Sequence, residues 1–333
     1  MRAFVSGAPG WLGNRLVEVL CKGWRSFPKP LVEGVRCLVL PGLDASCLTS
    51  LGAEIAIGDL RKKKTLQGIL EGTDVVFHLA GIIHPKRVGD FYALNTQGTQ
   101  NLLEAAIESK VRRFVYVSSN SVSGCNSSGE RLLTEEVMNP YKHYGLSKAL
   151  AERAVQEAFH KGVIETVILR PCWFYGPGQP ARQTRFFKMI KAGRPIVFGG
   201  GENLRSMSYI DNTIQGLLLV AESAKANGQV YWISDRRPYS VIEIYGTIAR
   251  ILDVTLKPRF IPALASTVCE GIDLLLQTFG FYSQDFHVAG EMAKSIACSI
   301  EKAERELGYQ PEIELEQGMR ISIGWCRKMG QPI

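Results

Sequence analysis

A tyrosine and a lysine four residues apart form the pair most suited to chemistry. Tyr144 and Lys148 occur in Tyr-Gly-Leu-Ser-Lys, where helical spacing begins, so both side chains share one helical face. A tyrosine hydroxyl titrates near ~10 in water, and an adjacent ammonium favours its phenolate. Ser119 ends an upstream strand-like segment and could hold a substrate oxygen. Together, Ser119, Tyr144 and Lys148 predict a catalytic centre that moves a proton on a secondary hydroxyl or a ketone.

Three glycines near the N-terminus predict a binding site for a phosphate-bearing cofactor. Gly7, Gly10 and Gly13 separate an apolar run from a helical one in Ser-Gly-Ala-Pro-Gly-Trp-Leu-Gly. Gly7 permits a tight turn, Gly10 lets backbone amides approach a pyrophosphate, and Gly13 lets helix and strand pack closely. The start of the following helix adds partial positive charge. The turn therefore predicts a bound NAD or NADP, and hydride transfer is the chemistry that matches the proton-transfer centre.

The adenosine end of this cofactor is less clearly marked. Asp59, in Gly-Asp-Leu after the third expected strand, either accepts a hydrogen bond from the adenine amino group or caps a helix. The second expected strand ends at residues 38–41 without an acid for the ribose 2′-hydroxyl or an arginine for a 2′-phosphate. The lack of arginine at Leu40 favours NAD only slightly.

Short β-branched runs alternate with helical stretches along the first half of the chain. The expected strands are residues 2–6, 35–40, 54–57, 74–79, 113–118 and 166–169, and the clearest helices are 11–20, 92–109 and 144–161. This alternation predicts an α/β fold with a doubly wound parallel sheet of the Rossmann type. Pro- and Gly-rich loops follow residue 170. We expect an NAD(P)-binding domain over 1–170 and a smaller, loop-rich, mainly substrate-binding part over 171–333, with one or two of its elements able to return to the sheet.

Composition limits the remaining possibilities. The eight cysteines among 333 residues show no two-residue spacing, so we expect reduced packing residues and no metal site. The net charge of +7 is spread along the chain, which predicts a small anionic substrate and no nucleic acid. Without a signal pattern or an apolar run of transmembrane length, a cytoplasmic location is expected. Residues 261–281 carry Glu270 and Asp273 in an apolar stretch, which favours an amphipathic helix or substrate lid over contact with a membrane surface.

Nine ordered blocks resemble the extended short-chain dehydrogenase/reductase superfamily. They are SGAPGWLG (6–13), GDL (58–60), HLAG (78–81), YALNTQGTQNLLEAA (92–106), VSSNSVSG (117–124), YGLSK (144–148), LRPCWFYGPG (169–178), RSMSYIDN (205–212) and KAERELGYQP (302–311). The resemblance implies a triad of Ser119, Tyr144 and Lys148 and a homodimer formed through helices 92–109 and 144–161. A binding or redox-sensing protein without catalysis is disfavoured because the whole triad is present. The cofactor contacts are expected at Gly7, Gly10, Trp11, Leu12, Gly13, Asp59, Leu60, Leu79, Ala80, Gly81, Asn95, Val117, Tyr144, Lys148 and Pro171.

Departures from the family pattern bear on the substrate. Sugar-nucleotide dehydratases carry an Asp-Glu pair where Asn120 and Ser121 stand here, so a usual dehydratase is disfavoured. Many relatives that bind nucleotide sugars have an asparagine at the position of Trp173, whose ring could instead stack on a sugar or a sterol. Arg205 matches an arginine that grips a diphosphate in those relatives.

Two branches of the superfamily therefore compete. We expect an epimerase or keto-reductase acting on a nucleotide sugar, with Ser119, Trp173 and Arg205 contacting the substrate. The alternative is an enzyme similar to 3β-hydroxysteroid and sterol dehydrogenases, which share the apolar segment near 261–281. An epimerase would keep its NAD bound, whereas a dehydrogenase or reductase would release it.

Overall fold

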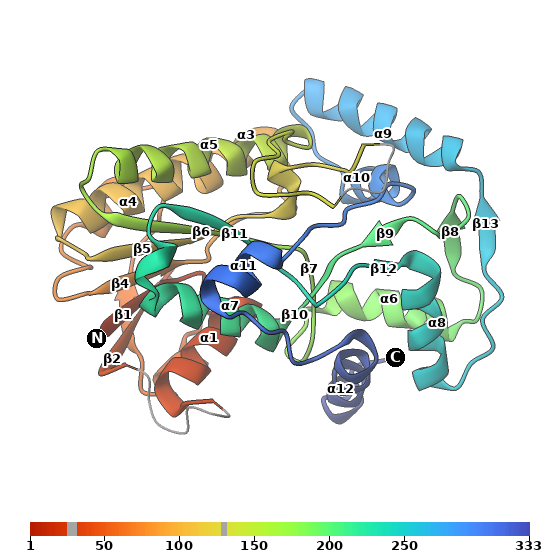
Figure 1. The fold of residues 1–333 in the computed structure, drawn as a ribbon, viewed down its shortest axis with the longest axis horizontal. Coiled ribbons are helices and arrows are strands. Elements are labelled where there is room, and N and C mark those ends of the chain that lie inside the picture. Colours follow the sequence, from red (N-terminus) through yellow and green to blue (C-terminus); the bar gives the residue numbers. More distant parts are fainter. Residues whose placement is uncertain (25–31, 128–131) are drawn as a thin grey trace.

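A seven-stranded parallel sheet lies at the centre of the computed structural model, which describes residues 1–24, 32–127 and 132–333 (Figure 1). The strand order is β11-β6-β5-β4-β1-β2-β3, so the doubly wound prediction is confirmed. The strands are β1 Arg2–Ser6, β2 Gly34–Val39, β3 Glu54–Ile57, β4 Val75–His78, β5 Arg113–Val117, β6 Glu165–Pro171 and β11 Gln229–Ile233.

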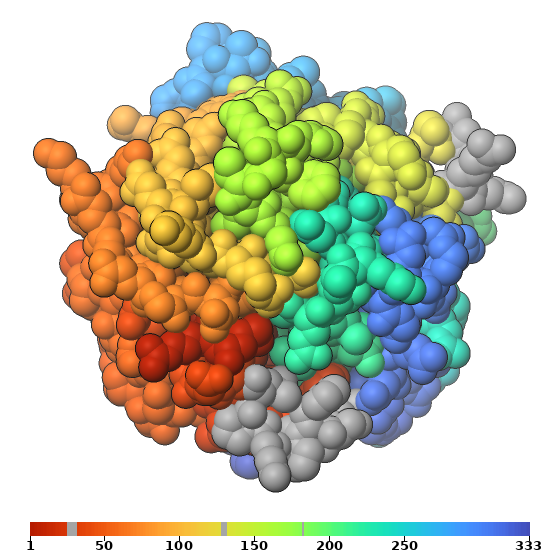
Figure 2. All heavy atoms as spheres, turned by 60° about the vertical axis from the view of Figure 1, so that its left-hand side comes forward, coloured from red at the N-terminus to blue at the C-terminus, as the bar shows by residue number. Residues whose placement is uncertain are grey.

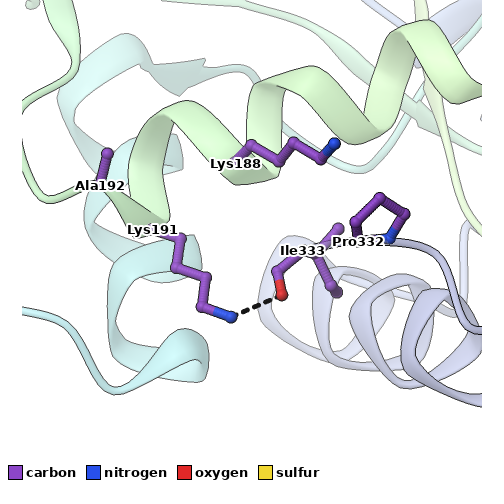
Figure 3. Close-up of a pocket in the computed structure, with 5 residues that line it drawn as sticks. All are labelled: Lys188, Lys191, Ala192, Pro332 and Ile333. Carbon is purple, nitrogen blue, oxygen red and sulfur yellow. Dashed lines mark hydrogen bonds between the residues drawn. The ribbon is translucent and has the colours of Figure 1, made fainter.

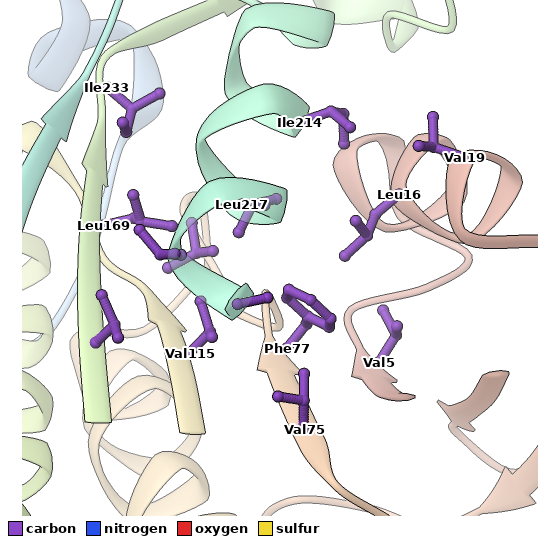
Figure 4. Close-up of a cluster of buried hydrophobic side chains, with 14 of the residues drawn as sticks. Val5, Leu16, Val19, Val75, Phe77, Val115, Leu169, Ile214, Leu217 and Ile233 are labelled. Atoms are coloured by element: carbon purple, nitrogen blue, oxygen red, sulfur yellow. The ribbon is translucent and has the colours of Figure 1, made fainter. Parts of the chain in front are cut away.

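Helices cover both faces of this sheet, which is why its strands read as unbroken apolar runs. Along β1, Val5 belongs to the core beneath one layer of helices and Phe4 to the core beneath the other. Figure 4 shows the first core, where strand residues face α1 and α7. The second core packs against α4 and α5. These helices are α1 Trp11–Lys22, α4 Gly98–Glu108, α5 Lys142–His160 and α7 Ile210–Glu222.

Short helical segments connect the main elements, most of them in the first half of the chain. The expected helix 92–109 is in fact two segments, because a π-helical stretch, η2 Tyr92–Gln97, precedes α4. Such π-helical insertions often occur at functional sites. The other short segments are α2 Ser46–Thr49, η1 Lys63–Leu66, α3 Val88–Phe91, η3 Asn120–Val122 and η4 Ala224–Ala226.

After β6 the chain builds a smaller part beside the carboxyl ends of the strands, and it returns β11 to the central sheet. The division at residue 170 stays a prediction, and β6 runs across it. A third core joins α6, α8 and α12. The strands are β7 Trp173–Tyr175, β8 Ile196–Phe198, β9 Leu204–Arg205, β10 Met207–Tyr209, β12 Tyr239–Ser240 and β13 Arg259–Ile261. The helices are α6 Ala181–Lys191, α8 Val241–Leu252, α9 Ala263–Thr278, α10 Gln284–Glu291, α11 Glu301–Leu307 and α12 Leu315–Lys328.

The segment that the sequence marks at 261–281 is α9 with its flanking residues. In the described ranges 1–24, 32–127 and 132–333, no helix is both long and apolar enough to cross a membrane.

A buried ion pair fixes α5 against β6. Arg170 donates to both carboxylate oxygens of Glu152, through Nε at 2.9 Å and Nη2 at 2.6 Å. Both side chains are essentially inaccessible, at 1% and 0% exposed. Arg170 also donates to the carbonyl of Glu135 at 2.8 Å, so the guanidinium is well satisfied. The pair holds the helix that carries Tyr144 and Lys148 in register with the sheet.

We expect Glu152→Ala to lower the free energy of unfolding by about 3–5 kcal/mol, because it leaves the buried Arg170 without its counter-charge. Glu316→Ala is the matched control, since it removes a carboxylate from the exposed pair with Arg250 and should cost less than about 1 kcal/mol. Urea unfolding of the two variants measures the difference. Equal losses would contradict this role of the buried pair.

Candidate active site

The glycine turn brings the loops after β1 and β4 into direct contact. Gly7 has a φ of +95°, and a Cβ there would lie 2.7 Å from the backbone of Leu79 and Ala80. A Cβ at Gly10 or at Gly13 would lie 2.5 Å from the carbonyl oxygen of Gly7. Gly10 is therefore needed for the turn itself, in addition to any approach of a ligand.

The N-terminus of α1 fits a pyrophosphate. The helix begins at Trp11, and its first turn contains no acidic residue. Its N-cap, Gly10, offers no side chain to satisfy the first amide groups. The free amides and the positive end of the helix dipole are the features that bind phosphate groups at such turns. This turn, including Leu12 and Gly13, fits NAD(P).

Asn95 holds the loop that follows β4. Its Oδ1 accepts from the Ile82 amide at 2.8 Å, and its Nδ2 donates to the Ile82 carbonyl at 3.0 Å. The side chain is fully buried within the π-helical stretch. A Cβ at Gly81 would approach Asn95 Oδ1 to 3.3 Å, so the loop passes tightly over the amide. Residues 79–81 are thereby fixed beside the glycine turn.

A buried histidine tightens the same region. His78 contacts Ser6 Oγ at 2.6 Å through Nδ1 and Thr99 Oγ1 at 2.8 Å through Nε2. Burial, followed by the charge of Lys148, lowers the pKa of His78 to about 3. The ring therefore stays neutral at physiological pH and acts as a rigid link between β1, β4 and α4.

Asp59 lies at the expected adenosine end. Its carboxylate accepts from Arg61 Nε at 3.0 Å and from Arg61 Nη2 at 2.8 Å. Hydrogen bonding from Arg61 lowers the pKa of Asp59 despite partial burial. Leu60 is buried next to it, and its carbonyl accepts from Asn101 at 2.7 Å. The Arg61 side chain is half exposed, so it places a cation next to Asp59 at the expected adenosine end of the cofactor.

Lys148 is held in a fully buried position at the end of β5. Its Nζ donates to the Val117 carbonyl at 2.8 Å and lies 4.3 Å from the centre of the Tyr116 ring. Burial lowers the pKa of Lys148 to about 7, and Glu152 only partly offsets this. The ammonium is thus fixed one helical turn from Tyr144.

Ser119 and Tyr144 line the same pocket, although Ser119 lies in the segment just after β5 and Tyr144 lies in α5. Ser119 is buried, and its Oγ accepts from the Ser121 amide at 3.2 Å. Tyr144 packs its ring against Phe91, with 5.7 Å between ring centres. Asn120 and Ser121, which replace the dehydratase pair, line this pocket as well. Ser119 and Tyr144 thus line one cavity, and Lys148 is held next to it by its bond to the Val117 carbonyl.

The pocket has a volume of about 740 Å³ and lies between the sheet edge and the smaller part. The smaller part lines it with four charged side chains, Arg185, Arg205, Asp285 and Glu291, and with a set of aromatic and aliphatic residues, of which only Phe174 lies in a block marked from the sequence. The aromatic and aliphatic residues are Phe174, Phe186, Met189, Ile196, Phe198, Tyr245, Val288, Met292 and Ile296. They come from separate elements with no shared motif, so only the tertiary fold reveals them.

The expected substrate residues also reach this cavity. Trp173 packs against Phe186, with ring centres 5.5 Å apart, and Trp11 donates from Nε1 to the Pro177 carbonyl at 2.6 Å. Pro171 lies at the cavity end of β6. Arg205 is 7% exposed, and its Nη2 donates to the Glu291 carbonyl. Its buried Nε has no hydrogen-bond partner among the described residues.

One polar cluster beside the pocket was missed from the sequence. Asp273, which is fully buried, accepts from Lys142 Nζ at 2.7 Å and Gln277 Nε2 at 2.9 Å, and it contacts His287 Nδ1 at 2.9 Å. Burial alone would raise the pKa of Asp273, but these hydrogen bonds lower it. His287 lines the pocket. The only hint of this cluster in the sequence was the position of Asp273 within the apolar stretch 261–281.

A second hollow lies apart from this site. A shallow surface hollow of about 370 Å³ lies between α6 and the C-terminal residues, where Lys191 Nζ donates to the Ile333 carbonyl at 2.6 Å (Figure 3). It shares no lining residue with the main pocket. Within the parts of the chain that the structure describes, no three His, Cys, Asp or Glu side chains are grouped to hold a metal ion.

The buried Lys148 should make stability depend on pH. Between pH 7 and about 10.5 the unfolded chain keeps the Lys148 proton and the folded chain releases it, so raising the pH favours folding. We expect the unfolding free energy of the unmodified protein to rise relative to that of Lys148→Met from pH 7 to pH 9. Lys225→Met, at an exposed lysine, is the control and should follow the unmodified protein. Parallel curves for Lys148→Met and the unmodified protein would refute the lowered pKa of the buried Lys148.

Known proteins are similar to this chain over nearly its whole length. The uncharacterized protein y4nL of Sinorhizobium fredii (strain NBRC 101917 / NGR234) is 44% identical, covering 98% of this chain and 95% of its own length. The 4-hydroxy-2-methyl-3-oxo-4-farnesyl-3,4-dihydroquinoline-1-oxide ketoreductase of Stigmatella aurantiaca is 28% identical, covering 96% and 95%. DesIV, a dTDP-glucose 4,6-dehydratase from Streptomyces venezuelae crystallised with NAD, superposes with a TM-score of 0.78 at 25% identity, covering 98% and 97%.

The family model that matches residues 4–263 is that of the 3-beta hydroxysteroid dehydrogenase/isomerase family. The match covers well over half of the chain. It agrees with the resemblance to extended short-chain dehydrogenases/reductases and names the branch that the sequence ranks second. The chain belongs to the 3-beta hydroxysteroid dehydrogenase/isomerase family and is an NAD(P)-dependent epimerase or dehydrogenase/reductase of the extended short-chain type.

Proposed function

We propose that this enzyme interconverts a secondary alcohol and a ketone on a substrate with an extended apolar body, using Ser119, Tyr144 and Lys148. The observation that carries the proposal is the pocket, which Ser119 and Tyr144 line together with many aromatic and aliphatic side chains. A ring system or alkyl chain would gain free energy by leaving water for such a lining.

Each member of the triad has a distinct task in this proposal. In the direction of reduction, the Tyr144 hydroxyl gives its proton to the substrate oxygen, and Ser119 donates a hydrogen bond that holds that oxygen. When bound, NAD(P)H would supply the hydride that the carbonyl carbon accepts. Lys148 stabilises the phenolate that remains on Tyr144 and offers donors to the nicotinamide ribose. The bond to Val117 keeps the lysine in place for this task.

The cofactor itself would lie along the carboxyl edge of the sheet. The glycine turn and the start of α1 would hold the pyrophosphate, and Asp59 the adenine. NAD is slightly favoured because Leu40 stands where an arginine would bind a 2′-phosphate. The complete proposed set is Gly7, Gly10, Trp11, Leu12, Gly13, Asp59, Leu60, Leu79, Ala80, Gly81, Asn95, Val117, Tyr144, Lys148 and Pro171.

One of the relatives supports an apolar substrate. The Stigmatella aurantiaca ketoreductase acts, by its name, on a quinoline oxide that carries a farnesyl group. Trp173 is central to the proposal, because its ring packs on Phe186 in the apolar lining instead of presenting an amide to a diphosphate.

A nucleotide sugar is the second candidate substrate, and Arg205 is the observation that favours it. The Nε of this buried guanidinium has no partner among residues 1–24, 32–127 and 132–333, and a diphosphate would satisfy it. Part of the guanidinium is already used, because Nη2 donates to the Glu291 carbonyl. In this case the enzyme would be an epimerase or keto-reductase of the kind first expected from the sequence.

We also propose a cytoplasmic homodimer that pairs through α4 and α5, which pack side by side on one face of the sheet (Figure 1). Sedimentation at micromolar concentration distinguishes a dimer from the 36.8 kDa chain.

Tyr144→Phe should lower kcat/KM by about 10²–10⁴, because the proton donor is lost, while NAD(P)H binding is unchanged. Tyr231→Phe is the matched control: it removes a tyrosine hydroxyl that donates to Glu306 at 3.0 Å and does not line the pocket. Steady-state assays and NAD(P)H fluorescence titration measure the two effects. A Tyr144→Phe variant as active as the Tyr231→Phe control would remove the catalytic assignment.

The substrate class is tested with steroid-sized ketones, long-chain alkyl ketones and UDP- or dTDP-sugars. We expect turnover of the apolar ketones with oxidation of NAD(P)H, and a loss of about tenfold or more in kcat/KM on Trp173→Ala, since burying such a side chain contributes roughly 1.5–3 kcal/mol. Arg205→Gln should leave these ketones almost unaffected. Epimerisation of a nucleotide sugar that Arg205→Gln abolishes would instead establish the second candidate.

A further inference from the structure

Helix α9 buries polar residues and exposes apolar ones, which is the reverse of an ordinary surface helix. Its fully buried positions are the polar residues Ser266, Asp273 and Gln277. Its exposed side carries large apolar residues, among them Leu264 at 70%, Leu275 at 60% and Phe279 at 71% exposed just after the helix. Helices on the surface of a soluble protein bury their apolar residues. The apolar outer side of α9 therefore indicates a surface that contacts something other than water.

Specific bonds fix this orientation. Ser266 Oγ donates to the Ala289 carbonyl at 2.7 Å, and Asp273 is held by Lys142, Gln277 and His287. Rotating the helix to bury its leucines would separate the Asp273 carboxylate from the Lys142 ammonium. Each charge would then lose its partner, which is unfavourable. The apolar side therefore stays outward.

The exposed apolar residues are continuous from β13 to the segment after α9, and we call them the α9 face. Its members are Phe260, Leu264, Val268, Ile272, Leu274, Leu275, Phe279 and Phe281. Figures 1 and 2 show this light-blue segment along the outer edge of the molecule. So many adjacent apolar side chains exceed the scattered exposure that is normal on a protein surface.

Basic residues lie at both ends of the α9 face. Arg259 precedes the helix, and the exposed Lys86 and Arg87 lie beside Phe281, to which Arg87 is bridged through the backbone. The two acids of α9 are turned away, since Asp273 is buried and Glu270 is paired with Lys294. The outer side of the helix thus offers apolar contact between cations and no exposed carboxylate.

We propose that the α9 face binds in the plane of an anionic lipid surface. Apolar side chains would enter the boundary between headgroups and acyl chains, while Lys86, Arg87 and Arg259 would contact anionic headgroups. A second copy of the chain is a poorer occupant. Antiparallel pairing of two such helices would bring Arg259 against Lys86 and Arg87 of the other copy, and parallel pairing would oppose each cation with itself.

Helix α10 connects this face to the pocket. It packs on α9 so closely that a Cβ at Gly290 would lie 3.0 Å from Glu270 Cα. Its other side presents His287, Val288 and Glu291 to the pocket. A lipid surface on α9 would therefore lie one helix away from the cavity, which suits a substrate that dissolves in lipid. This link to the substrate rests on the proposed function, but binding to lipid does not.

Vesicle flotation with the purified full chain tests the proposal. We expect the protein to float with vesicles of phosphatidylcholine containing about 30% phosphatidylglycerol and to bind at least tenfold less when Leu264 and Leu275 are both changed to Gln. Leu43→Gln with Met329→Gln is the matched control, because these residues are exposed but lie outside the face. Lys86→Gln with Arg87→Gln should weaken binding by about fivefold per charge, and added salt should do the same.

Several results would overturn it. Protein that stays at the bottom of the gradient with these vesicles excludes a lipid face. Binding that the control pair lowers as much as the Leu264 and Leu275 pair does excludes a specific one. A change in oligomeric state on Leu264→Gln with Leu275→Gln, seen by light scattering without vesicle binding, would show that a second copy covers the face. Circular dichroism checks that the variants fold. Because binding is scored without substrate, its failure is separate from failure of the proposed activity.

Discussion

A buried ammonium held on a strand-end carbonyl is the constraint on which the rest of the site depends. The bond from Lys148 Nζ to the Val117 carbonyl ties α5 to the end of β5. Because Tyr144 lies one helical turn earlier and Ser119 two residues beyond Val117, this single bond sets the position of both hydroxyls relative to the sheet. The ion pair between Glu152 and Arg170 fixes the same helix one turn further on. Burying Lys148, Glu152 and Arg170 costs free energy unless each has a hydrogen-bonding or charged partner. The elements that supply these partners must therefore pack closely around them.

The sequence was informative wherever a local pattern has one structural solution. The turn at Gly7, Gly10 and Gly13 and the alternation of strands and helices predicted the central sheet, because backbone clashes and apolar periodicity are local properties. Asn95 was expected in the cofactor region, but its π-helical surroundings were not, since helical periodicity does not distinguish the two windings. The apolar lining of the pocket and the cluster around Asp273 could not be predicted, because their members meet only through long-range packing.

The two halves of the chain impose different chemistry on one cavity. The sheet edge offers proton donors and a phosphate-binding turn, and the smaller part offers aromatic rings with one buried guanidinium. In the sequence, Trp173 argued against a nucleotide sugar and Arg205 argued for one. The packing of Trp173 against Phe186 favours an apolar substrate. The outward apolar side of α9 is consistent with that choice, since both features would handle molecules that avoid water.

Transfer of deuterium from NAD(P)H that carries deuterium at both positions of nicotinamide C4 tests the account most directly. The enzyme is mixed with the labelled cofactor and an apolar ketone, and the alcohol product is examined by mass spectrometry. We predict one deuterium on the carbinol carbon for each cofactor oxidised. Failure to form a labelled alcohol from any apolar ketone, with epimerisation of a nucleotide sugar and no net oxidation of cofactor, would contradict it.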